Sequence, residues 1–324
     1  MSAILVTGGA GYIGSHCCKA LSDAGYIPIT YDNLERGHAS AVQWGPLEQG
    51  DILDRRRLDE VFKKYKPEAV MHFAGYIAVG ESVEKPELYH KINVEGSRSL
   101  LEALVANDIN KIIFSSSAAI YGVPDQGPIP ETHPLNPINP YGKNKLDVER
   151  MLRDFEKKYA IWSVSLRYFN AAGADPDGET GELHNPETHL IPLVLQAAAG
   201  ETPNIHVFGN DYDTPDGTCV RDYIHVTDLV DAHILALESL LQDAKSATYN
   251  LGTGTGYSVL EIVAAARKVT GKEIPMMITN RRPGDAAVLV CSSERIKSDL
   301  AWQPKHSDLN TIIKTAWQWQ SKKC

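Results

Sequence analysis

Three side chains could together move a proton to and from a substrate hydroxyl group: Ser117, Tyr141 and Lys145. Tyr141 begins a helix-like stretch and Lys145 follows four residues later, so the two side chains are neighbours on one helix face. A lysine ammonium beside a phenol stabilises the phenolate and lowers its pKa from about 10 toward neutrality. We therefore predict that Tyr141 is a general base and that Ser117, at the end of a strand, shares the proton.

A glycine-rich turn near the N-terminus predicts a dinucleotide site. The sequence TGGAGYIGS places Gly8, Gly11 and Gly14 between a short apolar strand and an amphipathic helix. A helix N-terminus presents N–H groups and a partial positive charge to a pyrophosphate, and glycines let the backbone approach it closely. The turn has no Gly-Lys-Ser or Gly-Lys-Thr ending, which argues against a P-loop.

Two acidic residues indicate how the nucleotide is held. Asp32 ends the second predicted strand, close to the position about 20 residues beyond the glycines where a carboxylate binds the adenosine ribose. Because a carboxylate repels a 2′-phosphate, Asp32 favours NAD over NADP, although Arg36 lies close enough in sequence to weaken this preference. The alternative is a turn role for Asp32. Asp51 is expected near the adenine amino group.

The elements that must position these residues alternate between strands and helices. Strands are predicted at residues 3–8, 26–32, 68–75, 111–117 and 162–170, and helices near residues 12–24, 54–65, 87–107 and 141–158. This alternation predicts an α/β fold with a Rossmann-type doubly wound parallel sheet. Such a sheet binds ligands at the carboxyl ends of its strands.

The character of the chain changes after about residue 170. Loops rich in Pro, Gly, Asp and Asn then separate isolated helices, which predicts a smaller α/β lobe. We expect an NAD-binding domain over residues 1–170, carrying the three proton-handling side chains, and a substrate-binding lobe over residues 171–324. The later sequence NLGTGTG is interpreted as structural, because Ser258 and Glu261 fit a capping box.

Composition and charge exclude several classes of partner. The 324 residues include no apolar run near the about 18 residues that cross a bilayer, so we expect a soluble protein without a membrane partner. A net charge of −9 argues against nucleic acid. The N-terminus has no basic leader, which favours the cytoplasm. The five cysteines show no disulfide or zinc spacing, and the histidines, including His184 and His189, show no close metal-ligand pairing, so no metal is predicted.

Five motifs resemble the extended short-chain dehydrogenase/reductase family along essentially the whole chain: TGGAGYIGSH, HFAG, SSSAAIYG, PYGKNK and LRYFN. The resemblance implies that Ser117, Tyr141 and Lys145 form the catalytic triad, which exchanges a substrate proton while hydride passes to NAD. It also implies a set of cofactor contacts. These are Gly8, Gly11, Tyr12, Ile13, Gly14, Asp32, Asn33, Asp51, Ile52, Phe73, Ala74, Asn93, Ser117, Tyr141, Lys145 and Phe169.

Further motifs resemble the UDP-sugar 4-epimerases of that family: AVGESVEKP, VFGNDYDTPDGTCVRDYIHV and RRPGD. The resemblance implies interconversion of UDP-galactose and UDP-glucose through a 4-keto sugar, with NAD kept bound. The implied substrate contacts are Ser117, Tyr141, Asn170, Leu190, Phe208, Arg221, Arg282 and Asp285. Two arginines suit a diphosphate, which they grip through forked hydrogen bonds. The alternative is that these arginines are surface charges.

The residues after Ser117 argue against a related reaction. In this family, nucleotide-sugar dehydratases carry an acidic element there, because removal of water needs a further acid and base. Here those positions are Ala118 and Ala119. A UDP-glucuronate epimerase or decarboxylase is the alternative enzyme, and a noncatalytic dinucleotide-sensing protein is the alternative from another class.

Three positions depart from the pattern of these epimerases. Ile77 stands where Lys is frequent, and His189 stands where Asn is frequent. Leu289 stands where members restricted to unacetylated sugars tend to have Tyr, so we predict that UDP-N-acetylglucosamine and UDP-N-acetylgalactosamine are also accepted. Relatives pair through two helices, and residues 87–107 and 141–158 are expected to form a homodimer in the same way.

Overall fold

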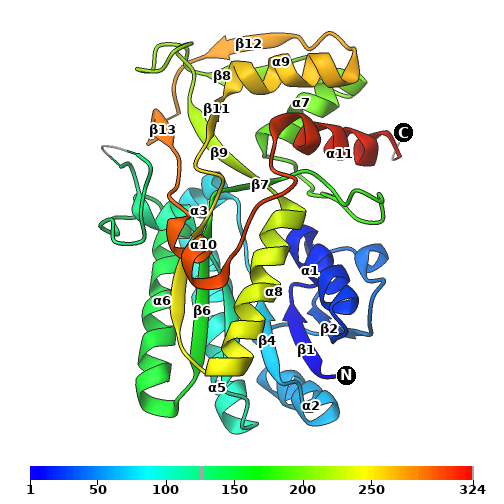
Figure 1. Ribbon diagram of the computed structural model, residues 1–324, viewed down its shortest axis with the longest axis vertical. Coiled ribbons are helices and arrows are strands. Elements are labelled where there is room, and N and C mark those ends of the chain that lie inside the picture. The colour runs from blue at the N-terminus through cyan, green and yellow to red at the C-terminus, as the bar shows by residue number, and fades with distance from the viewer. Residues whose placement is uncertain (125–126, 283, 323–324) are drawn as a thin grey trace. The chain divides into compact units, whose positions relative to one another are not determined.

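The computed structural model describes residues 1–124, 127–282 and 284–322, which form two compact units (Figure 1). The first unit comprises Met1–Gly122, Pro134–Arg167 and Val230–Tyr249. The second comprises the described residues of Val123–His133, Tyr168–Leu229 and Asn250–Cys324. The chain therefore returns to each unit more than once. The division at residue 170 does not include these returns, and it stays a proposal for the domain boundary.

The first unit is built on a seven-stranded sheet with the order β10-β6-β5-β4-β1-β2-β3. Its strands are β1 (Ala3–Thr7), β2 (Ile27–Asp32), β3 (Leu47–Gln49), β4 (Ala69–His72), β5 (Lys111–Ser117), β6 (Trp162–Tyr168) and β10 (Ala247–Leu251). The pairings of β1 with β2 and β4, of β2 with β3, and of β4 with β5 are all parallel. The predicted doubly wound sheet is confirmed, and its order reverses between β1 and β4.

Helices cover both faces of this sheet. They are α1 (Tyr12–Asp23), α2 (Arg55–Tyr65), α3 (Val79–Glu84), α4 (Pro86–His90), α5 (Gly96–Ala106), α6 (Pro140–Tyr159) and the part of α8 (Val226–Asp243) that belongs to this unit, with short 3-10 turns at Ala39–Ala41 and Ala118–Tyr121. On one face, α2, α5 and α6 contribute Phe62, Leu104 and Leu152 to a core shared with Val70. Met71, the next residue, faces the other way and accepts a hydrogen bond from Cys17 of α1 at 3.1 Å.

The predicted helical stretch over residues 87–107 is present, but it is not a regular α-helix throughout. A π-helical turn, Lys91–Glu95, separates α4 from α5. Such turns widen the backbone locally and are frequent at functional sites. Here the turn carries Asn93, one of the predicted cofactor contacts. The predicted strand over residues 162–170 also divides, because β6 ends at Tyr168 and β7 (Asn170–Ala172) belongs to another sheet.

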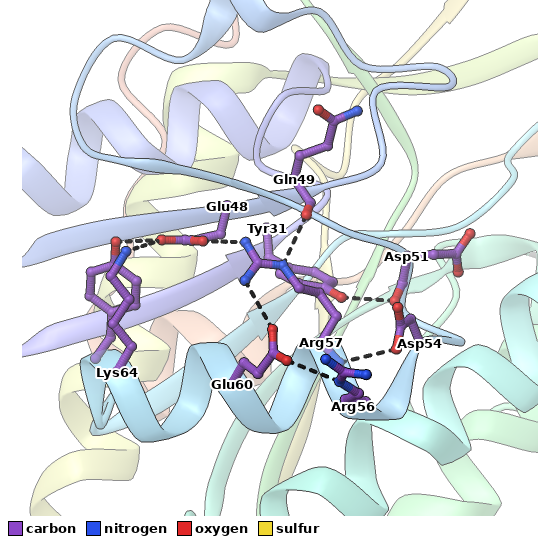
Figure 2. Close-up of polar contacts among 10 residues, drawn as sticks. Tyr31, Glu48, Gln49, Asp51, Asp54, Arg56, Arg57, Glu60 and Lys64 are labelled. Atoms are coloured by element: carbon purple, nitrogen blue, oxygen red, sulfur yellow. Dashed lines mark hydrogen bonds and ion pairs between the residues drawn. The ribbon is translucent and has the colours of Figure 1, made fainter.

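Glu48 is the centre of a polar network that fastens the edge strand β3 to α2 (Figure 2). Its carboxylate accepts hydrogen bonds from Lys64 at 2.6 Å, from Tyr65 at 2.6 Å, and from Arg57. Arg57 also donates to the Gln49 carbonyl oxygen at 3.1 Å. Burial raises the pKa of Glu48, but these hydrogen bonds outweigh burial and lower the pKa to about 2.

Replacing Glu48 with Gln is expected to lower the free energy of unfolding by about 1.5–3 kcal/mol near neutral pH, because charge-assisted hydrogen bonds are lost. The carboxylate has a lower pKa in the folded chain, so its contribution is complete above its ordinary pKa and is lost as the pH falls toward about 2. Urea unfolding of both proteins should therefore show a difference that shrinks below about pH 4.5. Glu60→Gln, at a carboxylate whose side chain is 49% exposed, is the control and should change stability by less than about 0.5 kcal/mol. A difference between wild type and Glu48→Gln that grows with acidity would contradict this role.

The second unit is a smaller α/β structure, as predicted. Its strands are β7, β8 (Ile205–Phe208), β9 (Val220–His225), β11 (Gly256–Ser258), β12 (Met276–Thr279) and β13 (Val288–Leu289), and its helices are α7 (Leu190–Ala199), α9 (Val259–Thr270), α10 (Glu294–Leu300) and α11 (Leu309–Ser321). β9 pairs with β7 and β13 in parallel and with β11 antiparallel. A core formed by α7, α9 and α11 includes Val194, Ile262 and Ile312.

Several smaller expectations can be compared with the structure. Ser258 and Glu261 form the predicted capping box at the start of α9. Cys17, Cys18, Cys219 and Cys291 are buried thiols, as expected, whereas Cys324 lies outside the described residues. In the described part of the chain, no helix combines the length and apolar character needed to span a membrane.

Candidate active site

The turn between β1 and α1 leaves no room for side chains. Gly8 has a φ of +74°, in the left-handed region that favours glycine. A Cβ on Gly14 would lie 2.1 Å from the Gly8 carbonyl oxygen, and a Cβ on Gly8 would lie 2.6 Å from the Ala74 nitrogen. Gly11 is the N-cap of α1 and provides no side-chain hydrogen bond. The three glycines put no side chain of their own at this helix N-terminus, which suits a pyrophosphate.

The carboxylate of Asp32 lies beside this turn, at the end of β2. It accepts hydrogen bonds from the backbone nitrogens of Ala10 at 3.1 Å and Leu34 at 2.9 Å. Burial raises the pKa of Asp32, and these two hydrogen bonds partly counter the rise. Arg36, which could have attracted a 2′-phosphate, instead pairs with Glu81 at 3.1 Å. The arrangement therefore favours ribose hydroxyls over a phosphate.

The end of β3 is tied to the end of β2. Asn33 donates a hydrogen bond to the Asp51 carboxylate at 3.2 Å. The Tyr31 hydroxyl donates to the Asp51 carbonyl oxygen at 2.8 Å (Figure 2). Ile52 is buried against Gly96, where a Cβ would lie 2.5 Å from its Cδ1 atom. Asp51 is thus held at the carboxyl edge of the sheet by β2 and the residue that follows it.

The segment after β4 closes the same edge. The backbone nitrogens of Phe73 and Ala74 both donate to the Thr7 carbonyl oxygen, at 2.9 and 3.0 Å. Asn93, in the π-helical turn, accepts from the Tyr76 nitrogen at 2.7 Å and donates to the Tyr76 carbonyl oxygen at 3.0 Å. This bidentate contact fixes the loop that follows Ala74.

The predicted cofactor contacts of the first unit share one place, the carboxyl edge of the sheet around the reversal of strand order. Those described so far, with Tyr12 and Ile13 as the first residues of α1, are Gly8, Gly11, Tyr12, Ile13, Gly14, Asp32, Asn33, Asp51, Ile52, Phe73, Ala74 and Asn93. A bare helix N-terminus and a buried carboxylate beside it fit the pyrophosphate and ribose of NAD. Phe169 lies in the second unit, where its nitrogen donates to the Leu251 carbonyl oxygen at 3.2 Å.

Replacing Gly14 with Ala is expected to weaken NAD binding by about 5- to 100-fold, because overpacking of a fitted turn costs about 1–3 kcal/mol. The added methyl group would meet the Gly8 carbonyl oxygen, which cannot move without opening the turn. NAD released from denatured protein after gel filtration measures the effect. Gly80→Ala is the control, since a Cβ there meets nothing within 4 Å. Full NAD content in the Gly14 variant would refute the role of the turn.

The three proton-handling residues meet at the end of β5 and the start of α6. Ser117 is the last residue of β5, and Tyr141 and Lys145 lie in the first turns of α6. Tyr141 is 8% exposed and hydrogen-bonds with the Ser117 side chain. The Lys145 Nζ atom lies 5.7 Å from the centroid of the Tyr141 ring and donates to the Ser115 carbonyl oxygen at 2.7 Å. The sequence prediction that these side chains converge is confirmed.

Local sequence explains why α6 begins where it does. The Asn139 side chain accepts a hydrogen bond from the Gly142 nitrogen at 2.8 Å, and Pro140 occupies the first helical position. A Cβ on Gly142 would lie 2.5 Å from the Ala119 carbonyl oxygen. Glycine at position 142 therefore lets the helix approach the turn that follows Ser117.

In the second unit, four of the predicted substrate contacts come together. Asp285 pairs with Arg221 at 3.3 Å and with Arg282 at 2.9 Å. The Arg282 guanidinium lies 4.7 Å from the centroid of the Phe208 ring. Arg221 is also fixed through hydrogen bonds to the Val220 and Ala286 carbonyl oxygens. The predicted convergence of two arginines in this lobe is confirmed, and the cluster suits an anion beside a planar ring.

The other two residues of this unit that were predicted to contact the substrate lie outside the arginine cluster. Asn170 opens β7 and donates to the Asp222 carbonyl oxygen at 2.8 Å. Leu190 is the first residue of α7 and packs against the core of the second unit. Both remain predictions as substrate contacts.

Comparison with known proteins identifies the family of the chain. The family model described as NAD dependent epimerase/dehydratase family matches residues 4–252. The chain belongs to this family. A UDP-glucose 4-epimerase from Rhizobium leguminosarum bv. trifolii is 51% identical over 319 residues, covering 98% of this chain and 97% of the relative.

Solved structures of epimerase/dehydratase family members are similar over nearly the whole chain. A UDP-glucose 4-epimerase from Brucella ovis in complex with NAD has a TM-score of 0.96 at 51% identity, covering 98% of both chains. One from Bifidobacterium longum, in complex with NAD+ and UDP, has a TM-score of 0.94 at 39% identity, covering 99% of this chain and 98% of that one. The family, the fold and the NAD dependence predicted from the sequence are therefore confirmed.

One electrostatic prediction for this epimerase/dehydratase chain is wrong. Lys145 was expected to lower the pKa of Tyr141. Instead, burial raises the pKa of Tyr141, and the hydrogen bond with Ser117 lowers it only in part. Burial also lowers the pKa of Lys145 to about 8, so Lys145 still carries most of its positive charge at neutral pH. Without a further positive charge, the phenol of the chain alone stays protonated.

Sequence reasoning missed a buried ion pair beneath the proton-handling residues. Arg167 of β6 donates to both carboxylate oxygens of Glu149 in α6, at 2.9 and 2.6 Å. Ser116 donates to Glu149 at 2.6 Å, and Arg167 donates to the Tyr121 hydroxyl at 2.9 Å. The spacing of Glu149, four residues after Lys145, was the available signal. The pair links β5, β6, α6 and the turn after Ser117.

A buried histidine was also missed. His72, at the end of β4, hydrogen-bonds with Thr7 at 2.7 Å and with Ser97 at 2.8 Å, and Ser97 donates to the Asn93 carbonyl oxygen at 2.5 Å. Burial, with a further contribution from Lys145, lowers the pKa of His72 to about 3, so the ring is neutral. It connects the glycine turn to the π-helical turn.

The departures from the epimerase pattern lie in different places. Ile77 is 41% exposed and precedes α3. His189 is the N-cap residue of α7 and contacts Glu182 and Glu187. The expectation that His184 and His189 show no close pairing is wrong, because it considered helical spacing only. The loop before α7 brings the two rings to a centroid distance of 5.1 Å.

Proposed function

We propose that the protein is an NAD-dependent UDP-glucose 4-epimerase, an isomerase that interconverts UDP-galactose and UDP-glucose through a transient 4-keto sugar. The observation that supports this most directly is the convergence of Ser117, Tyr141 and Lys145 at the carboxyl edge of the sheet. The Rhizobium leguminosarum relative and the Brucella ovis structure, which match nearly the whole chain, carry the same enzyme name.

In the proposed mechanism, the Tyr141 phenolate takes the proton from the sugar C4 hydroxyl group. Ser117 hydrogen-bonds with Tyr141 and orients the hydroxyl group between them. Lys145, held by the Ser115 carbonyl oxygen, keeps its ammonium beside the ring. NAD, when bound, would supply the acceptor and donor of hydride at C4, and its positive charge would favour the Tyr141 phenolate. Tyr141 then returns the proton to the C4 oxygen.

The arginine cluster of the second unit is proposed to hold the nucleotide end of the substrate. Arg221 and Arg282 supply two guanidinium groups for a diphosphate, while Asp285 keeps both in place. Phe208 is 38% exposed and offers a ring face to the uracil. Anchoring at the UDP end leaves the sugar able to turn, which the reaction requires.

The residues between Ser117 and Tyr121 disfavour a dehydratase. Ala118 and Ala119 form the 3-10 turn there, and Ala118 is only 4% exposed. Neither side chain can give or take the additional protons that elimination of water requires. A UDP-glucuronate epimerase or decarboxylase is distinguished by its products.

The function is tested on the purified full chain. Protein denatured after gel filtration is expected to release NAD, and incubation with UDP-galactose is expected to yield UDP-glucose, resolved by chromatography. UDP-glucuronate should remain unchanged. Absence of both bound NAD and NAD uptake, or absence of UDP-glucose formation, would overturn the proposal.

We also propose that acetylated UDP-sugars are accepted. Leu289 pairs in register with Arg221, so this smaller side chain lies next to the proposed nucleotide anchor. The same assay with UDP-N-acetylglucosamine tests the point. No turnover at enzyme concentrations that convert UDP-galactose would refute it.

A homodimer that acts in the cytoplasm completes the proposal. The helices expected to pair, α5 and α6, pack together in the first unit. Sedimentation at micromolar protein is expected to give twice the mass of one chain, and a single-chain mass would refute the dimer.

A further inference from the structure

The loop before α7 gathers two histidines and two glutamates that the proposed reaction does not use. Glu182, His184, Glu187 and His189 each place one oxygen or nitrogen atom within 4.8 Å of the corresponding atoms of the other three. All four residues belong to the second unit and lie within eight positions of the chain. The cluster mixes imidazole and carboxylate groups, which are the preferred ligands of divalent transition metals.

The distances within this cluster are close to those of a four-coordinate metal site. The Nδ1 atoms of His184 and His189 each lie 2.8 Å from the same Glu182 oxygen. Glu187 lies 3.0 Å from the His189 Nδ1 atom and 3.9 Å from the His184 Nδ1 atom. Ligand atoms around tetrahedral Zn²⁺ are about 3.3–3.6 Å apart, so the atoms need to shift by less than about 1 Å.

The electrostatics of the cluster favour a cation. The Glu182 and Glu187 side chains are only 8% and 7% exposed, so two carboxylates share a poorly hydrated place. A divalent ion would bring two positive charges to these two carboxylates.

Further hydrogen bonds hold the Glu182 backbone and the Glu187 carboxylate in place. The Trp319 indole of α11 donates to the Glu182 carbonyl oxygen at 3.0 Å. The Glu187 carboxylate accepts hydrogen bonds from the backbone nitrogens of Thr188 at 2.7 Å and His189 at 2.8 Å. Such partners orient ligands before a metal arrives.

We propose that Glu182, His184, Glu187 and His189 bind one divalent transition-metal ion, with Zn²⁺ as the best match. The ion fastens the loop to the first turn of α7, which begins directly after His189. This is a structural site, and it does not depend on the proposed epimerase activity. Because two imidazoles take part, the site is expected to prefer Zn²⁺ to Mg²⁺.

The test measures metal on the full chain after treatment with a chelator and dialysis against Zn²⁺. Plasma mass spectrometry is expected to find about one Zn²⁺ per chain, and the melting temperature is expected to rise by at least about 2 °C. The double variant His184→Ala with His189→Ala should bind Zn²⁺ more than about 100-fold more weakly, since loss of even an outer partner costs about 10- to 100-fold.

Two single variants are matched controls. His206→Ala removes an exposed histidine, and Asp177→Asn removes one carboxylate of the separate cluster formed by Asp175, Asp177 and Glu179. Both should keep the bound Zn²⁺. Equal Zn²⁺ binding by the wild type and the double variant would overturn the proposal.

Co²⁺ supplies a measurement that needs no variant. Wild-type protein loaded with Co²⁺ should show the visible absorption bands of a four-coordinate ion. Their absence at saturating Co²⁺ would overturn the proposal, even if the double variant failed to fold.

Discussion

Replacing Tyr141 with Phe is expected to reduce kcat for conversion of UDP-galactose by about 10²- to 10⁴-fold, the usual contribution of a positioned general acid or base. The ring stays in place and only the hydroxyl group is lost. Because Tyr141 is buried beside Ser117, no water can readily take over its proton transfer. Initial rates with UDP-galactose and the NAD content of the same preparation measure the effect.

The variant should retain NAD, which separates a catalytic loss from a folding loss. Tyr159→Phe is the matched control, since Tyr159 lies at the far end of the same helix and is 41% exposed. That variant should keep the wild-type rate. An unchanged rate for Tyr141→Phe would show that another group handles the proton.

Replacing Glu149 with Leu is expected to lower the free energy of unfolding by about 3–5 kcal/mol, because it leaves a buried guanidinium without its carboxylate. The Glu149 and Arg167 side chains are 1% and 5% exposed. Ser116 would also lose its acceptor, which disturbs the end of β5 next to Ser117. Chemical unfolding followed by circular dichroism measures the loss.

The double variant Glu149→Leu with Arg167→Met is the informative companion. Removing both charges is often neutral where removing one is costly, so the double variant should recover most of the stability. Asp147→Ala, which removes a partner of the exposed Arg150, should cost less than about 0.5 kcal/mol. A loss below about 1 kcal/mol for Glu149→Leu would contradict the proposed role of the pair.

The helices and strands that were predicted correctly are those whose own residues are enough to determine their secondary structure. β1 and β5 are apolar runs, and α1 follows a glycine turn that excludes side chains. Two strands of the seven-stranded sheet were missed, for different reasons. β3 has only three residues, and its one buried residue is Glu48. A glutamate in a sequence predicts an exposed position, and here it is buried because Arg57 and Lys64 pair with it. β10 joins the sheet from a distant part of the chain.

In the site, too, local sequence predicts which side chains are neighbours but not the properties that depend on distant residues. The spacing of Tyr141 and Lys145 was enough to predict that they are neighbours. It was not enough to predict the pKa of Tyr141, which depends on burial by residues from several elements. Likewise, Glu182 and His189 are brought together by a loop whose course has no periodic pattern in the sequence.

β10 comes from residues 247–251, far along the chain from its neighbour β6, and this affects truncated forms of the protein. A fragment that stops after codon 170 would contain the nucleotide-binding motifs but not the strand that lies next to β6. It would leave an open row of backbone hydrogen-bonding groups along β6, and such edges recruit other chains and aggregate. Insoluble expression of that fragment would then reflect a missing neighbour, even though every motif for the cofactor is present.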